Sequence, residues 1–244
     1  MQQSVLITGA SSGIGLATIE KLLERQYKVI GVSRTPPPLT NALFTFIPFD
    51  LSKLHSIPTL CHHVIKTHPD LNILICNAGI GCFGHLEQLS HSQITQTLTI
   101  NLMSHIFLVK GLLPELKKKD FSNLLFIGSE AALKGKRKGS IYCASKFALR
   151  GFAQALREEC QTSTVKVSVL HPGVVNTPFY RDLFFSPGEN EGNALRAQDV
   201  AEAILTILEL PPYALFEEIT LFPTKQAIAF KNKKKPKATL FNED

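Results

Sequence analysis

Tyr142 and Lys146 are the side chains whose types and spacing first suggest chemistry. They lie four residues apart in the run Ser-Ile-Tyr-Cys-Ala-Ser-Lys, and Ser129 precedes Tyr142 by thirteen residues. Residues i and i+4 of a helix share one face, so the phenol and the ammonium can meet at a single site. Beside a bound hydride donor, such a pair would suit the reduction of a carbonyl group.

A glycine-rich turn near the N-terminus is the candidate site for that donor. The run Thr8-Gly-Ala-Ser-Ser-Gly-Ile-Gly15 lies between a predicted strand and a predicted helix. Glycines let a backbone approach phosphates, and a helix N-terminus offers free N–H groups and a positive dipole end. The spacing G-x-x-x-G-x-G differs from the usual dinucleotide fingerprint. A tight turn without a ligand is the alternative, but the position after the first strand favours a nucleotide. The candidate contacts are Gly9, Ser11, Ser12, Gly13, Ile14 and Gly15.

The residues after the second predicted strand indicate which nucleotide is bound. NAD-binding folds usually carry an Asp or Glu about twenty residues after the glycines, where it binds the ribose 2′-hydroxyl. Between Glu24 and Asp50 the chain has no acidic residue, and Ser33-Arg34 follows the strand instead. A hydroxyl and a guanidinium suit a 2′-phosphate. We expect NADP(H) to be favoured, with Arg34 as its main determinant, while NAD(H) stays open. An exposed loop arginine without a ligand is the alternative.

Strands and helices alternate along the chain, and this order must position the polar residues. Apolar runs predict seven strands, at residues 5–8, 28–32, 44–49, 73–76, 124–127, 165–170 and 219–222. Helices are predicted after the glycine turn and at 57–66, 141–159 and 200–208, with a long one from the Ser90/Gln93 capping box through Asn101 to about Leu116. This alternation predicts an α/β fold with a Rossmann-like, doubly wound parallel sheet and helices on both faces.

Length and charge indicate one globular domain followed by a basic tail. We expect a single domain over residues 1–224 and a basic, disordered tail over 225–244 of the 244-residue chain. The tail has six Lys against Glu243 and Asp244, a net +4 of the total +6. A membrane-surface or nucleic-acid patch is the alternative. Nucleic acid is disfavoured, because no aromatic residue interleaves with the lysines of 231–237.

Location and metal content are predicted from patterns that the sequence lacks. No apolar run of membrane-spanning length and no signal-peptide pattern is recognised, so we expect a cytoplasmic protein without a membrane span. The five cysteines are scattered and lack CxxC pairing, which favours free thiols and no metal site.

Taken together, these motifs resemble the short-chain dehydrogenase/reductase family, in its compact single-domain branch. The resemblance runs from about Val5 to Pro223 and implies an oxidoreductase that reduces a ketone or aldehyde reversibly. It also implies a homodimer or homotetramer joined through the helices that carry Asn101 and Tyr142. The residues that carry the resemblance are Gly9, Gly13, Gly15, Asn77-Ala-Gly79, Asn101, Ser129, Tyr142, Lys146 and Pro172-Gly173.

The resemblance implies a catalytic role for four residues. Tyr142 would donate a proton in reduction and act as the base in oxidation. The Lys146 ammonium, with the charge of the oxidised nicotinamide, would lower the tyrosine pKa from its usual value of about 10. Ser129 would hold the substrate oxygen, and Asn101 would hold a water that links Lys146 to solvent.

Further cofactor contacts are implied along the chain. Asp50 would contact the adenine, although it could simply cap the next helix. Asn77, Ala78 and Gly79 would flank the adenine ribose, or form a plain strand-end turn. Tyr142 and Lys146 would contact the cofactor as well, Lys146 by a hydrogen bond to the nicotinamide ribose. The remaining implied contacts, along the nicotinamide, are Pro172, Gly173, Val175 and Thr177.

One departure from the family concerns the adenine side. Three consecutive prolines at 36–38 leave too few residues for the helix that usually joins the second and third strands. This side should therefore be more open.

Two stretches are expected to line the substrate side, residues 130–140 and 179–193. The second is apolar and flexible enough to form a lid over a greasy substrate, or it could simply pack onto the domain. The first carries a basic rim that would attract an anionic substrate or carrier, unless it is a solvated loop. A 3-oxoacyl thioester reductase and a non-catalytic NADP(H) sensor remain alternatives. The rim consists of Lys134, Lys136, Arg137 and Lys138.

Overall fold

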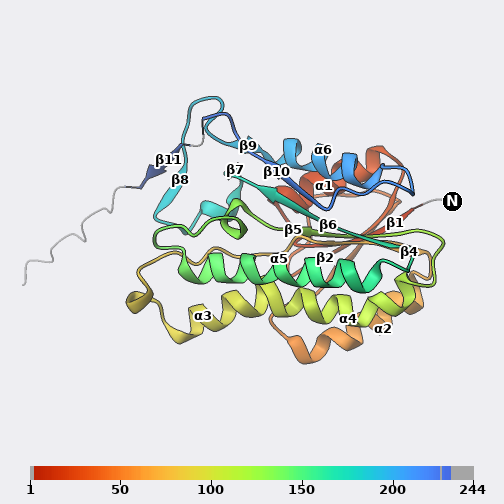
Figure 1. Cartoon of the computed structure of the whole chain (residues 1–244). Helices are drawn as coiled ribbons and strands as arrows, with labels where there is room; N and C mark the ends of the chain where they lie inside the picture. Colours follow the sequence, from red (N-terminus) through yellow and green to blue (C-terminus); the bar gives the residue numbers. More distant parts are fainter. Residues whose placement is uncertain (1–2, 226, 232–244) are drawn as a thin grey trace, which may run out of the picture.

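A seven-stranded parallel sheet forms the middle layer of the molecule (Figure 1). The computed structural model describes residues 3–225 and 227–231. The strands lie in the order β10-β6-β5-β4-β1-β2-β3, which confirms the predicted doubly wound sheet. Its strands are β1 (Ser4–Thr8), β2 (Lys28–Ser33), β3 (Phe44–Pro48), β4 (Leu71–Cys76), β5 (Ser122–Ile127), β6 (Val165–Pro172) and β10 (Glu218–Leu221).

Helices cover both faces of this sheet (Figure 1). On one face lie α2 (Ile57–Thr67), α4 (Ser104–Leu116) and α5 (Ser140–Cys160), and on the other lie α1 (Gly13–Glu24) and α6 (Ala197–Leu208). Successive side chains of a strand point to opposite faces, so Leu74 joins the core under α2, α4 and α5. Its neighbours Ile73 and Ile75 join the core under α1 and α6. The central strands are apolar throughout because both of their faces are buried.

The helix predicted from Ser90 to Leu116 is interrupted. The Ser90/Gln93 capping box is present and opens α3 (His91–Leu98), but a π-helical turn, Thr99–Met103, separates it from α4. Asn101 lies in this turn. By length and composition alone the whole stretch His91–Leu116 could cross a membrane, although no apolar run of that length was expected. In the structure it packs against α2 and α5 beside the sheet.

Two small sheets at the edge of the molecule were not predicted. In one, β7 (Val175–Asn176) pairs with β9 (Leu195–Arg196), and in the other β8 (Phe185–Pro187) pairs antiparallel with β11 (Ile228–Phe230). The second pair corrects the predicted tail, because a strand falls inside 225–244. The tail was predicted from its lysines, but the apolar residues 228–230, which precede most of these lysines, form a strand. Residues 232–244 lie outside the described part of the chain.

The connection between β2 and β3 contains no helix, as the three prolines predicted.

Candidate active site

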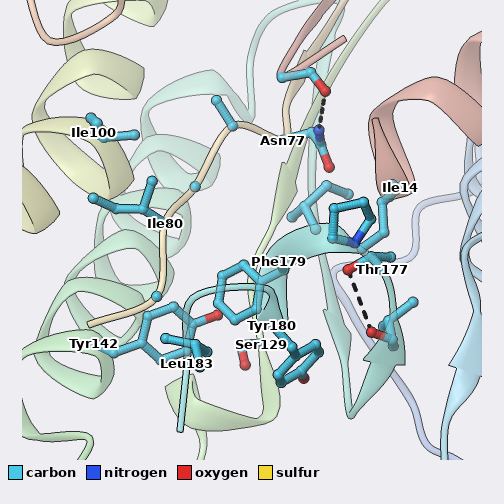
Figure 2. A pocket seen from close by; sticks show the side chains of 18 of the residues that line it. Ile14, Asn77, Ile80, Ile100, Ser129, Tyr142, Thr177, Phe179, Tyr180 and Leu183 are labelled. Atoms are coloured by element: carbon cyan, nitrogen blue, oxygen red, sulfur yellow. Dashed lines mark hydrogen bonds between the residues drawn. The ribbon is translucent and has the colours of Figure 1, made fainter. Parts of the chain in front are cut away.

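A single cleft of about 1050 Å³ at the carboxyl ends of the strands brings most of the predicted residues together (Figure 2). It lies where the strand order changes direction between β1 and β4, the usual ligand position in such sheets. Of the predicted site residues, Asn101 and Gly15 do not line it. Those that do are Gly9, Ser11, Ser12, Gly13, Ile14, Ser33, Arg34, Asp50, Asn77, Ala78, Gly79, Ser129, Tyr142, Lys146, Pro172, Gly173, Val175 and Thr177.

The glycine turn forms an uncapped helix start that opens onto the cleft. Gly9 and Gly13 have φ angles of +73° and +58°, which suit glycine. A Cβ on Gly15 would lie 2.1 Å from the Gly9 carbonyl oxygen, so this position admits only glycine. Ser12, the N-cap of α1, makes no side-chain cap, and the first turn has no acidic residue. The first N–H groups of α1 are therefore suited to bind a pyrophosphate.

Thr8 and Asn77 hold this turn against β4. The Asn77 Nδ2 atom donates to the Thr8 carbonyl at 2.8 Å. The backbone N–H groups of Asn77 and Ala78 both donate to the Thr8 hydroxyl, each at 3.0 Å. The side chain of Asn77 therefore fixes the glycine turn. Sequence reasoning missed Thr8, whose one signal was a hydroxyl at the end of an apolar strand.

The adenine side of the cleft carries Arg34 and Asp50. Arg34 is exposed on the cleft wall, and the Ser33 hydroxyl donates to the Thr35 carbonyl at 2.7 Å. The Asp50 carboxylate accepts from the Ser52 N–H at 3.0 Å and from its hydroxyl at 2.8 Å. These bonds lower the pKa of Asp50. Asp50 thus closes a local turn, which resembles the alternative that it caps the next helix. It also lines the cleft.

Tyr142 and Ser129 direct their hydroxyls into the same part of the cleft (Figure 2). Tyr142 comes from the first turns of α5, and only 9% of it is exposed. Burial raises the pKa of Tyr142, and a hydrogen bond with the Ser129 side chain acts in the opposite direction. The Ser129 oxygen also accepts from the Ala131 N–H at 3.1 Å, which fixes its position.

Lys146 lines the same cleft as these hydroxyls and is buried. Its ammonium donates to the Ile127 carbonyl at 2.9 Å and lies 6.0 Å from the centroid of the Tyr142 ring. Burial lowers the pKa of Lys146 to about 8. The chain by itself therefore does not give Tyr142 the lowered pKa that the family resemblance implied. Desolvation of the phenol dominates, because the ammonium is directed at a backbone carbonyl.

The Asn101 side chain makes three hydrogen bonds that hold the site together. Its Oδ1 accepts from the Ile80 N–H at 2.8 Å, and its Nδ2 donates to the Ile80 carbonyl at 3.0 Å. Nδ2 also donates to the Ser145 hydroxyl at 3.1 Å, which in turn donates to the Tyr142 carbonyl at 2.7 Å. Asn101 therefore joins the π-helical turn to the loop that follows β4 and to α5. Ser145, one residue before Lys146, carried no sequence signal of this role.

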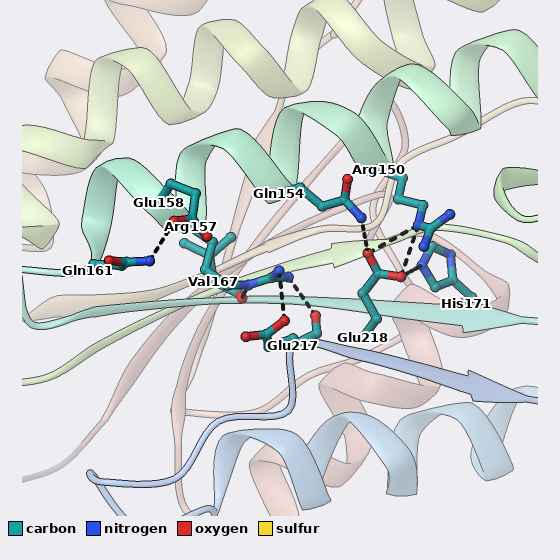
Figure 3. Close-up of polar contacts among 9 residues, drawn as sticks. All are labelled: Arg150, Gln154, Arg157, Glu158, Gln161, Val167, His171, Glu217 and Glu218. Atoms are coloured by element: carbon teal, nitrogen blue, oxygen red, sulfur yellow. Dashed lines mark hydrogen bonds and ion pairs between the residues drawn. The ribbon is translucent and has the colours of Figure 1, made fainter.

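A second polar cluster, which was not predicted from the sequence, joins β6, β10 and α5 (Figure 3). His171 is fully buried on β6, and a Cβ on Gly128 would lie 2.4 Å from its Nδ1, so the ring packs directly under the strand that leads to Ser129. The His171 Nε2 lies 3.6 Å from Glu218. Glu218 accepts from Arg150 at 2.9 Å and from Gln154 at 2.7 Å. These contacts tie α5 to β10.

Both stretches predicted for the substrate side reach the cleft. The second contributes mainly aromatic rings; Phe179 lies 5.8 Å from Tyr142 between centroids. In the basic rim, Lys136, Arg137 and Lys138 line the cleft, whereas Lys134 does not. Lys136 also pairs with Glu130 at 3.0 Å.

Comparison with known proteins gives the family. Residues 3–185 match the family described as short chain dehydrogenase. The chain belongs to this family and is an oxidoreductase, as its motifs suggested.

Individual relatives are similar over most of their length. The sepiapterin reductase of Chlorobaculum tepidum is 29% identical over 240 residues, covering 92% of this chain and 97% of that protein. The 3-ketodihydrosphingosine reductase of Bacteroides thetaiotaomicron is 30% identical over 210 residues, covering 85% and 75%. An alcohol dehydrogenase from the archaeon Thermococcus sibiricus, solved with 5-hydroxy-NADP, superposes with a TM-score of 0.84 at 26% identity and covers 93% of this chain and 99% of its own.

Proposed function

We propose that the protein reduces a ketone or aldehyde to an alcohol, reversibly, with Tyr142 as the proton donor. The observation that carries this proposal is the meeting of two hydroxyls and a glycine turn in one cleft. Tyr142 and Ser129 line the same cleft as the uncapped start of α1, and Lys146 is buried beside them.

The cofactor is a nicotinamide dinucleotide, and NADP(H) is favoured. The glycine turn and the first N–H groups of α1 would hold the pyrophosphate. Arg34, exposed on the cleft wall, would hold the 2′-phosphate. The similar alcohol dehydrogenase that was solved with 5-hydroxy-NADP supports this assignment. When bound, the cofactor supplies the hydride.

The residues of the chain supply the proton and hold the oxygen. The Tyr142 phenol is protonated at neutral pH, because burial raises its pKa above an already high ordinary value of about 10. In reduction this proton passes to the carbonyl oxygen of the substrate, and the hydride adds to the carbon, which gives an alcohol and a phenolate. The Ser129 hydroxyl would hold the same oxygen while negative charge develops on it. The Lys146 ammonium, buried nearby, would stabilise the phenolate.

Turnover of a carbonyl panel, followed by NADPH absorbance, tests this mechanism. We expect Tyr142→Phe to lose at least about 100-fold in kcat while NADPH binding is retained. Tyr213→Phe is the matched control, because Tyr213 is 92% exposed and lies outside the cleft. Activity that survives Tyr142→Phe would refute the mechanism. Tight NADPH binding without turnover of any carbonyl would favour the sensor instead.

A further inference from the structure

We infer that the C-terminal strand β11 is part of the substrate site and selects carbonyl compounds with a long apolar body. This inference rests on the proposed reductase function and names its substrate class. Ile228 and Phe230 of β11 line the same cleft as Tyr142. They lie more than forty residues beyond residue 185, where the match to the family model ends.

Backbone pairing ties β11 to the predicted lid. Phe230 is in register with Phe185, and Ile228 with Pro187. The ladder is extended at both ends, where Gly188 donates to the Ala227 carbonyl and Lys231 to the Phe184 carbonyl, each at 2.9 Å.

The Lys231 side chain adds a second attachment to the lid. Its ammonium donates to the Tyr180 carbonyl at 2.6 Å and to the Arg181 carbonyl at 2.9 Å. The lid and β11 therefore form one wall.

A continuous row of aromatic rings connects the proposed proton donor to this strand. Neighbouring centroids along the row are 5.8, 5.1, 5.6, 5.1 and 6.2 Å apart. Such a row offers apolar contact along its whole length. The Lys138 ammonium lies 5.1 Å from the Phe184 centroid and places one charge beside its outer part. In order, the rings are Tyr142, Phe179, Tyr180, Phe185, Phe184 and Phe230.

The outer end of this row is left open to solvent. Phe230 is 69% exposed and Ile228 is 45% exposed, although both belong to the cleft lining. When a ligand covers large exposed apolar side chains at the mouth of a cleft, the burial of their surface stabilises the complex. A short ketone held at Tyr142 would not reach them, whereas a long alkyl or aryl body would. Contact with β11 should therefore raise the specificity for long substrates alone.

Two neutral methyl ketones test this selection, butanone and one with an octyl chain. For the Ile228→Ala/Phe230→Ala variant we expect kcat/KM for the octyl ketone to fall roughly tenfold, mainly through KM. Butanone turnover and NADPH affinity should stay unchanged. Phe222→Ala is the matched control, since Phe222 is 42% exposed but does not line the cleft. An equal fall for both ketones, or none for the octyl ketone, would overturn the inference.

Hydrogen exchange supplies a readout that does not depend on turnover. In the NADPH-loaded protein, the octyl ketone should slow exchange in residues 227–231, and butanone should not. If neither ketone is turned over but this protection appears, the proposed reaction is wrong and the apolar site stands. If the octyl ketone is turned over without this protection, β11 does not contact the substrate and only the inference fails. If both turnover and protection are missing, both proposals fail.

Discussion

Lys146 is 4% exposed, and its ammonium donates to the Ile127 carbonyl. Burial lowers its pKa from 10.5 to about 8, so the folded state disfavours the charged form. One pKa unit corresponds to about 1.4 kcal/mol, which makes this cost roughly 3 kcal/mol at neutral pH. Because the folded pKa lies below the unfolded one, the cost is complete below about pH 8 and disappears as the pH rises past 10.5.

We therefore expect Lys146→Met to stabilise the protein while it abolishes reduction. The free energy of unfolding at pH 7 should rise by about 1–2 kcal/mol, less than the full cost because the Ile127 carbonyl loses its donor. The gain should shrink toward pH 10. Urea unfolding at both pH values measures it. A loss of stability at pH 7, or an equal gain at both, would contradict the pKa direction.

Arg34 offers a second test at the scale of a single residue. It is exposed on the cleft wall, so its removal should leave stability unchanged. We expect Arg34→Ala to lower kcat/KM for NADPH roughly tenfold to a hundredfold by loss of charge-assisted hydrogen bonds, with little effect on NADH. Steady-state kinetics with both cofactors measure the ratio. A wild-type preference for NADH, or unchanged NADPH use in the variant, would remove Arg34 from the site.

Among the elements, α5 carries both Tyr142 and Lys146, and its middle is tied to β10 (Figure 3). Arg150 and Gln154 of α5 both bind Glu218 of β10. Burial alone would raise the pKa of Glu218, but these hydrogen bonds outweigh it and the pKa is lowered. The stabilisation is therefore present above the unfolded pKa and is lost as the pH falls through the folded one.

Glu218→Gln should weaken this attachment. We expect it to reduce the free energy of unfolding by about 1–2 kcal/mol at pH 7. The difference should shrink as the pH falls below the ordinary glutamate pKa of about 4.3. Glu209→Gln is the control, because its pair with Arg25 is largely exposed and should matter by less than about 0.5 kcal/mol. Denaturant unfolding across this pH range compares the two. Equal effects of the two substitutions would mean that the Glu218 contacts add no more than a surface ion pair.

At the scale of the whole molecule, the outer surface of α4 and α5 exposes large apolar side chains. Met103 precedes α4 and is 39% exposed, Phe107 of α4 is 37% exposed, and Phe147 of α5 is 43% exposed. Exposed apolar patches of this kind mark contact surfaces between proteins. We propose that two copies of the chain associate through these helices.

Light scattering coupled to size exclusion tests this association. We expect a homodimer or homotetramer for the natural chain and a smaller species for Phe147→Glu, because a buried unpaired carboxylate would oppose the contact. Tyr213→Glu is the control, since Tyr213 is 92% exposed in the turn before β10 and belongs to neither α4 nor α5. A monomeric natural chain, or a Phe147→Glu variant that stays assembled, would refute the proposal.

The sequence by itself determined the succession of the seven main strands along the chain, the glycine turn and the pairing of Tyr142 with Lys146 on one helix. These features follow from local spacing, since helix and strand periods and the i, i+4 relation act within a few residues.

Only the tertiary structure decided how Asn101, Lys146 and β11 are used. Asn101 in the π-helical turn hydrogen-bonds Ile80, the Lys146 ammonium donates to the Ile127 carbonyl, and β11 pairs with β8. Each of these depends on a partner at least nineteen residues away in the sequence. Because such contacts form only when distant parts of the chain come together in the fold, local sequence patterns do not predict them.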